Sequence, residues 1–168
     1  MKIRFCLAVA GFIVLGGLLD SCAPTKGAHL TGSKKMRGGW MLASVDVEDT
    51  AAIYQSLPIF EDAGISCLKG TAWTFDENDL GEYTVVPANT GSCIKGIRKI
   101  NWLMLNINGT DFLQFRRASA VAGVKKDRFT NYILEIESLD KTMMRLKYPV
   151  YYNGNTTVMH FNFKHIGK

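Results

Sequence analysis

The sequence has few of the residues from which catalytic and metal sites are usually built. Its 168 residues include only three histidines and four cysteines. It contains no nucleophile, base and acid arrangement, no glycine-rich phosphate loop and no paired carboxylates at a plausible site. Basic residues are scattered in short pairs such as Arg116-Arg117, whereas a nucleic-acid surface needs a basic stripe with exposed aromatic residues. We therefore expect no enzyme, no metal or cofactor site and no nucleic-acid partner.

Long apolar runs are lacking beyond the N-terminus. Lys2 and Arg4 precede an uncharged run from Phe5 to Leu19, which is the pattern of a signal peptide. This run is shorter than the roughly 20 residues that a transmembrane helix needs. The four residues Leu19-Asp20-Ser21-Cys22 resemble the bacterial lipobox, which predicts cleavage after residue 21 and a lipid on Cys22. The alternative is an ordinary secretory peptide cleaved elsewhere, with Cys22 an incidental thiol.

A lipidated cysteine would divide the chain into three parts. We expect a signal peptide over residues 1–21, the lipidated Cys22 with a flexible tether over residues 22–37, and a folded domain over residues 38–168. The tether has too few apolar residues to offset the entropy of ordering it. The residues after Cys22, Ala-Pro-Thr-Lys-Gly, lack the acidic cluster that resembles a surface-export signal. The expected location is the cell envelope, with acyl chains such as palmitate holding the protein in the outer membrane, facing the periplasm.

Two cysteines remain once Cys6 is removed with the signal peptide and Cys22 is lipidated. In an oxidising compartment Cys67 and Cys93 should pair. A hairpin folded about Asn78 would place Cys67 opposite a position near residue 89, within a few residues of Cys93. A disulfide between them is therefore predicted, and two buried free thiols are the alternative.

Through most of the domain, apolar and polar residues alternate, which is typical of an antiparallel sandwich or barrel. The strongest turn signal is Asn108-Gly109, because both residue types tolerate positive φ in a tight hairpin. Asp49 to Ala63 instead has apolar residues at roughly helical intervals and predicts one short helix or two. Asp49-Thr50-Ala51 resembles a Bacteroidetes O-glycosylation motif, although capping of that helix by Asp49 or Thr50 is the favoured interpretation. Eight strands are predicted, over residues 39–47, 71–76, 80–86, 97–107, 110–117, 131–138, 142–151 and 156–166.

The inward faces of these strands are rich in aromatic residues and methionine. Such a set fits either a solid core or an apolar ligand cavity, and the alternation does not separate the two. The fourth strand is apolar on both faces, so its outer face is expected to be covered by the helix or by a partner. The candidate cavity residues are Trp73, Phe75, Leu134, Ile136, Leu146, Tyr148, Met159, Phe161 and Phe163.

Several segments together resemble a known family. Gly38-Gly39-Trp40 is similar to the Gly-x-Trp motif of lipocalins, in which the tryptophan closes the base of an eight-stranded barrel. The other matching segments are the helix after the first strand, Cys67 to Phe75, Cys93, Ile100-Asn101-Trp102, Tyr132 to Leu139 and Met144-Arg145-Leu146. Together they look like the lipocalin-like lipoproteins of Bacteroidetes, over residues 38–166.

This resemblance implies an all-β fold, an eight-stranded antiparallel up-and-down lipocalin-like barrel with a short helix after the first strand. It implies that Trp40 closes the barrel and that Arg145 matches the arginine that packs over this tryptophan. It also implies a cup-shaped apolar interior that binds a small hydrophobic, lipid-like molecule without catalysis.

Binding of such a ligand by a membrane-anchored lipoprotein is the leading hypothesis for function. The alternative is a structural or interaction lipoprotein of the envelope, whose solid barrel holds a protein partner or inhibits a protease through its surface. An enzyme, the third class, would be indicated by polar groups that converge inside the barrel.

Overall fold

The fold is taken from a computed structural model, which describes residues 33–48, 57–86, 93–118, 130–152 and 154–167. The predicted signal peptide, Cys22 and most of the predicted tether lie outside the described residues, as do Asp49 to Ser56. Among the helices that are described, none is long and apolar enough to cross a membrane.

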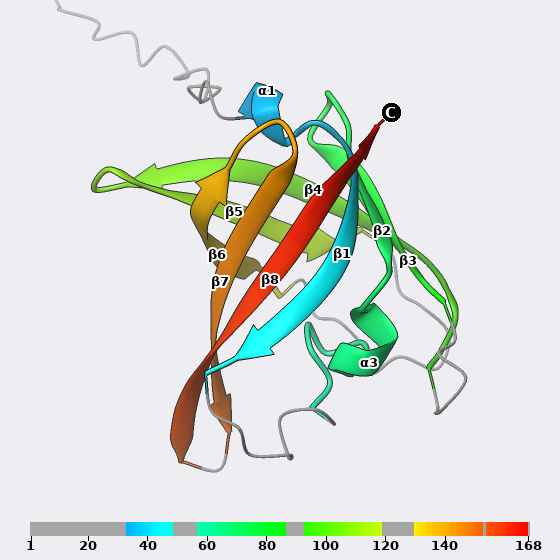
Figure 1. The fold of residues 1–168 in the computed structure, drawn as a ribbon, viewed down its shortest axis with the longest axis vertical. Helices are drawn as coiled ribbons and strands as arrows, with labels where there is room; N and C mark the ends of the chain where they lie inside the picture. Colours follow the sequence, from blue (N-terminus) through cyan, green and yellow to red (C-terminus); the bar gives the residue numbers. More distant parts are fainter. Residues whose placement is uncertain (1–32, 49–56, 87–92, 119–129, 153, 168) are drawn as a thin grey trace, which may run out of the picture.

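Eight antiparallel strands, arranged in chain order, close into a barrel (Figure 1). The last strand pairs with the first, so the up-and-down topology predicted from the sequence is confirmed. The strands are β1 (Gly38–Val47), β2 (Ala72–Phe75), β3 (Leu80–Val85), β4 (Gly96–Ile107), β5 (Thr110–Arg117), β6 (Tyr132–Leu139), β7 (Met143–Tyr152) and β8 (Asn155–Gly167).

The hairpin connections follow from local backbone chemistry. Asn108 and Gly109 have φ of 53° and 87°, so the β4–β5 turn uses the left-handed conformations predicted for this dipeptide. In the β2–β3 hairpin Ala72 pairs with Thr84 and Phe75 with Gly81, which centres the turn on residue 78 as predicted.

The segment after the first strand, in which one short helix or two were predicted, is described only in part, because residues 49–56 lie outside the described residues. Of the range Asp49 to Ala63, residues 57–63 form a tight turn in which Ile59 and Ala63 exchange backbone hydrogen bonds. Pro58 has no backbone N–H and a fixed φ, which disfavours a helix through this point. The structure describes a short helix just after this turn, α3 (Ile65–Leu68), which lies at one end of the barrel in Figure 1.

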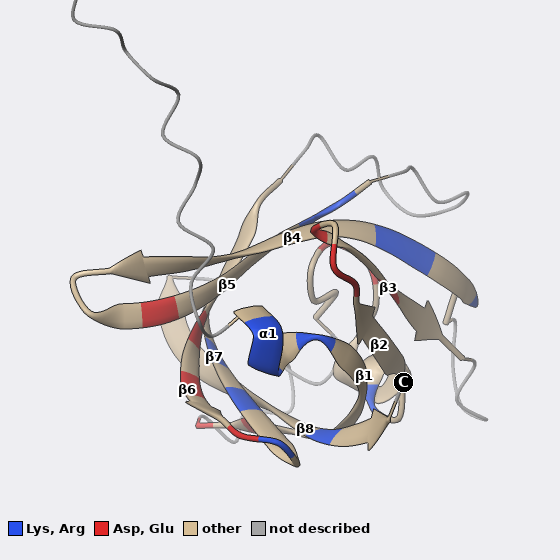
Figure 2. Ribbon diagram, turned by 90° about the horizontal axis from the view of Figure 1, so that it is seen from above, with Lys and Arg blue, Asp and Glu red and all other residues tan. Residues whose placement is uncertain are grey.

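The opposite end of the barrel is covered by the helix α1, Ser33–Met36 (Figure 2). These residues belong to the predicted tether, yet the Met36 side chain is fully buried in the core. Trp40 is also fully buried, and its indole N–H donates a hydrogen bond to the Met36 carbonyl at 2.7 Å. The ordered domain therefore begins before Gly38.

The ring that packs against Trp40 is His165, with centroids 4.9 Å apart. Arg145 does not take the position over Trp40 that the family resemblance implies, and that expectation is wrong. Its guanidinium pairs with Glu137 at 2.8 Å, because in β7 the flanking Met144 and Leu146 point into the core and turn Arg145 outward.

The outward face of β4 remains accessible over the part of the chain that the structure describes. Ile97, Leu103 and Ile107 are 55%, 39% and 48% exposed. Among the described residues, the helix α3 does not cover this face, because it lies at one end of the barrel (Figure 1).

Cys67 and Cys93 form the predicted disulfide, with Cα atoms 5.7 Å apart. The bridge joins the end of α3 to the segment that leads into β4. It therefore fixes α3 relative to the start of β4, at the end of the barrel where α3 lies.

Replacing both cysteines with serine is expected to lower the free energy of unfolding by about 2–4 kcal/mol, because the open chain regains the entropy that a bridge across 26 residues removes. Urea denaturation of the oxidised protein and the double variant measures the difference. Reduced wild type is the control and should unfold like the variant. A reduced protein as stable as the oxidised one would contradict this expectation.

Candidate functional site

The predicted cavity residues do meet inside the barrel. Strands β2, β6, β7 and β8 bring all nine into one cluster, in which seven side chains are buried and Ile136 and Tyr148 are partly buried. The remaining core positions of β4 and β5 include Trp102 and Phe115, which the candidate set omitted. The interior is therefore lined largely by aromatic rings.

A side chain from outside the strands occupies the middle of this lining. Phe60, in the turn of residues 57–63, is 3% exposed although it belongs to a loop. The ring centroids around it lie 5.0–6.2 Å away, and they belong to Trp73, Phe115, Tyr132, Tyr148 and Phe161. The turn therefore inserts one aromatic group into the space that these five rings surround.

The inserted turn has an unusual backbone. Phe60 and the exposed Glu61 have φ of 55° and 52°, a conformation that costs free energy for residues other than glycine. The Tyr132 hydroxyl donates a hydrogen bond to the Phe60 carbonyl at 2.8 Å and helps to hold the turn in place. Interactions with the barrel thus offset the local strain.

A polar cluster lies beside the inserted ring. Asp62, from the same turn, faces Arg98 of β4, and both side chains are fully buried. Arg98 Nε is 2.9 Å from Asp62 Oδ2 and Arg98 Nη2 is 2.9 Å from Oδ1, which is a two-pronged ion pair. The Tyr83 hydroxyl also donates to Asp62 Oδ2, at 2.6 Å, and the Ile94 carbonyl accepts from Arg98 Nη2 at the same distance.

The electrostatics of this cluster are those of a low-dielectric site. Burial is the main cause that raises the pKa of Tyr83 well above its ordinary value, and the neighbouring Asp62 carboxylate adds to it. The hydroxyl therefore remains protonated and serves as a hydrogen-bond donor. Arg117, also buried, is near enough to oppose part of this shift. Polar groups therefore do converge inside the barrel, the feature named above as the indication of an enzyme, but here they pair with one another: Asp62 and Arg98 neutralise each other's charge and Tyr83 donates to Asp62.

Sequence analysis missed Phe60, Asp62, Tyr83 and Arg98. The signal for Arg98 was present, because inward-facing Ile100 and Trp102 place it on the same face of β4. The turn of residues 57–63 gave no such signal, because its apolar residues are spaced roughly as they would be in a helix.

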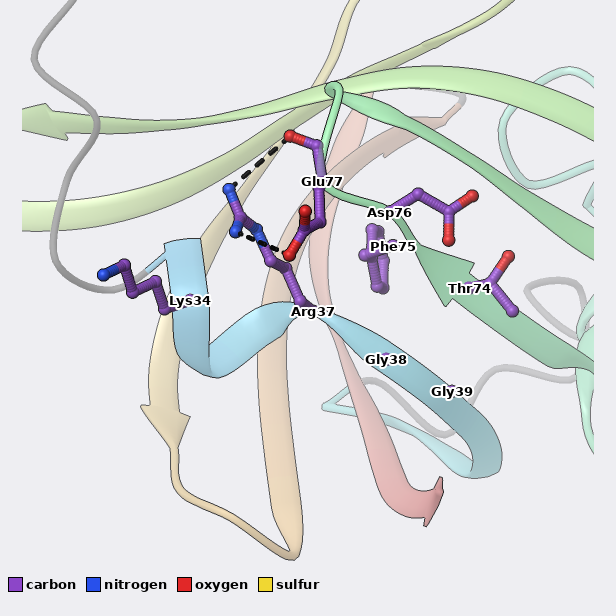
Figure 3. A pocket seen from close by; sticks show the side chains of 8 residues that line it. All are labelled: Lys34, Arg37, Gly38, Gly39, Thr74, Phe75, Asp76 and Glu77. Atoms are coloured by element: carbon purple, nitrogen blue, oxygen red, sulfur yellow. Dashed lines mark hydrogen bonds and ion pairs between the residues drawn. The ribbon is translucent and has the colours of Figure 1, made fainter. Parts of the chain in front are cut away.

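A cleft lies at the end of the barrel covered by α1 and is shown in Figure 3. It encloses about 720 Å³, and residues 34, 37–39 and 74–77 line it. Arg37 crosses it to Glu77, with Nη1 3.5 Å from Oε1. Phe75 is the one predicted cavity residue among these lining residues, so the cleft adjoins the aromatic interior at that side chain.

On the outer surface, His160 of β8 lies between two carboxylates. Its Nδ1 is 2.8 Å from Glu137 and its Nε2 is 3.1 Å from Glu48. This contact joins β8 to β6 and to the residue after β1. Burial tends to raise the pKa of Glu137, but hydrogen bonds from His160 and Arg145 outweigh it, and the pKa is lowered.

Replacing Glu137 with glutamine is expected to remove a pH-dependent contribution to stability. Because folding lowers the pKa of Glu137 from its ordinary 4.5, the carboxylate stabilises the fold above that pH and stops doing so as the pH falls through the lowered value. The gap in unfolding free energy between wild type and variant should therefore shrink below pH 4.5. Urea titrations at several pH values measure it, with Glu82→Gln on β3 as a control. A gap that widens in acid would refute this account.

No known protein-family model and no curated protein matches this chain. One similar solved structure is a complex of bovine odorant binding protein with a selenium-containing odorant. It is 12% identical, the match covers 81% of this chain and 73% of that chain, and the TM-score is 0.45. Similarity at this level says nothing about what the present chain binds.

Proposed function

We propose that this protein binds a small hydrophobic molecule in the aromatic interior of its barrel and catalyses no reaction. The observation that carries the proposal is the position of Phe60. A loop side chain, not a strand residue, occupies the space between aromatic rings from five strands. Withdrawal of one turn would open this space and leave the strands in place.

The energetics of the turn favour such an exchange. A ligand ring that replaces Phe60 recovers the same aromatic contacts, each pair being worth roughly 0.5–1.5 kcal/mol beyond burial of apolar area. The left-handed backbone of Phe60 and Glu61 would relax at the same time. Ligand binding then competes with an internal side chain, and the observed affinity is lower than the intrinsic affinity of the open barrel.

The proposal includes the cellular setting. We propose that this protein is a lipocalin-like lipoprotein of the Bacteroidetes type. Its lipidated Cys22 would anchor it in the outer membrane, facing the periplasm. The support is the lipobox-like sequence before Cys22 and the polar segment that follows it. A ligand drawn from that membrane, or delivered to it, is the natural cargo. The intact mass of the protein purified from membranes tests the lipid.

Phe60→Ala is expected to tighten binding of the neutral probe 1-aminoanthracene on the order of tenfold, because it removes the internal competitor. Fluorescence titration of wild type and variant measures this, and native mass spectrometry after gentle purification should find a co-purifying apolar molecule. Phe112→Ala is the matched control, since Phe112 faces outward on β5 and is only partly buried. If the folded wild type and Phe60→Ala both fail to bind the probe, the proposal is wrong.

The second candidate is an interaction lipoprotein with a solid barrel. The buried Phe60 favours this second candidate if the turn of residues 57–63 never leaves the barrel interior. The exposed apolar residues of β4 would then supply a contact surface. In that case a pull-down should recover a specific envelope protein, and substitutions such as Phe60→Ala should leave that interaction intact.

A further inference from the structure

We infer that Arg98 and Tyr83 form a carboxylate-binding site inside the barrel, which Asp62 of the chain itself occupies when no ligand is bound. The inference rests on the proposed function and adds the class of ligand. The expected ligand is a monocarboxylate with a hydrophobic body, such as a medium-chain or aryl-substituted acid.

The geometry around Asp62 is that of a recognised carboxylate. Two guanidinium nitrogens of Arg98 and the Tyr83 hydroxyl converge on its two oxygens at 2.6–2.9 Å. A planar guanidinium matches a carboxylate in this two-pronged way, which selects the planar anion over a single oxygen atom. All three side chains are buried, so water does not compete for these contacts.

One donor of the site is unused. Arg98 Nη1 is buried and makes no hydrogen bond to any residue that the structure describes, which is costly for a charged group. A side-chain carbon built on Gly96, whose φ is 143°, would come within 3.1 Å of this nitrogen. The glycine therefore keeps the space beside Nη1 clear, and a ligand carboxylate that sits slightly differently from Asp62 can reach it.

The turn itself has the chemistry of the expected ligand. Within three residues it places an apolar ring, Phe60, among aromatic side chains and a carboxylate, Asp62, on Arg98. An amphiphilic acid carries the same two groups. We therefore treat the turn as an internal substitute for such a molecule.

The charges explain why an acid exchanges with the turn more readily than a neutral ligand. When an acid enters, its carboxylate replaces that of Asp62, and Arg98 never loses its counter-charge. When a neutral molecule displaces the turn, the buried guanidinium is left without an anion, which is strongly unfavourable. Selectivity for acids therefore follows from the positive charge of Arg98, which stays in the barrel when the turn leaves.

Decanoate and decan-1-ol test this selectivity, because they share a hydrocarbon chain and differ only in the head group. Calorimetric titration of the whole mature protein should give at least tenfold tighter binding of decanoate. In Arg98→Met the preference should fall below threefold while decan-1-ol still binds. Arg116→Met, on the exposed outer face of β5, is the matched control and should keep the preference.

The outcomes separate this inference from the proposed function. If neither compound binds to wild type, the proposed function fails. If both bind with equal affinity, or Arg98→Met keeps the preference, the barrel binds ligands and the carboxylate site is refuted. Should Arg98→Met not fold, Asp62→Asn takes its place: saturating decanoate should raise its thermal midpoint more than that of wild type. An equal or smaller rise would also refute the inference.

Discussion

Replacing Asp62 with asparagine is expected to lower the free energy of unfolding by about 3–5 kcal/mol. The substitution preserves the size of the side chain and removes its charge, so the fully buried guanidinium of Arg98 loses its counter-ion. The amide can accept fewer of the hydrogen bonds that now converge on the carboxylate. Urea denaturation at neutral pH measures the loss.

Two further variants show that charge, and not shape, causes this effect. Tyr83→Phe removes one hydrogen bond to Asp62 and should cost only about 1.5–3 kcal/mol. The double variant Asp62→Asn with Arg98→Met removes both charges and should be more stable than Asp62→Asn alone. If the free energy lost in the double variant equals or exceeds the sum of the losses in Asp62→Asn and in Arg98→Met, the pair acts mainly by packing.

Replacing Trp40 with alanine is expected to cost about 3–5 kcal/mol, because it leaves a large cavity between α1 and the barrel. The indole is fully buried, touches His165 and bonds to the carbonyl of Met36, so its loss also frees the helix. The change in unfolding free energy measures the first effect. Faster proteolysis within Ser33–Met36 of the folded variant measures the second.

Trp40→Phe separates these two contributions. It keeps an aromatic ring and loses the N–H that binds Met36, so it should cost roughly 1–2 kcal/mol. Proteolysis near α1 should still accelerate. If Trp40→Ala unfolds at the same urea concentration as wild type, the indole does not hold this end of the barrel closed.

The strands were predictable because each has one buried and one exposed face. Alternation places the ends of β4 and β5 within a residue of their observed positions, and the Asn108-Gly109 turn fixes their register. The pairing of Cys67 with Cys93 was predicted from the expected oxidising compartment and from the centre of one hairpin. These features depend on local pattern, which a single sequence contains.

The polar part of the interior depends on contacts between distant residues. In β4 the apolar Ile97 is exposed and the charged Arg98 is buried, the reverse of what their hydrophobicity suggests. This inversion is stable only because Asp62, 36 residues earlier, enters the barrel to meet Arg98. His160 is likewise buried between two carboxylates on other elements, although its sequence context is that of an exposed strand face. None of these three carboxylates lies near, in the sequence, the residue that it pairs with.

The disulfide also shortens the chain path between Asp62 and Arg98. Along the backbone these residues are 36 positions apart, but Cys67 and Cys93 each lie five positions from one of them. Through the bridge the path is roughly a third as long, which reduces the entropy cost of bringing the two charges together by about 1 kcal/mol. Formation of the bridge therefore favours the Asp62–Arg98 ion pair and, with it, the inserted position of Phe60 in the same turn. In the proposed exchange between ligand and turn, reduction of this bridge would lower the affinity that a ligand needs to displace Phe60.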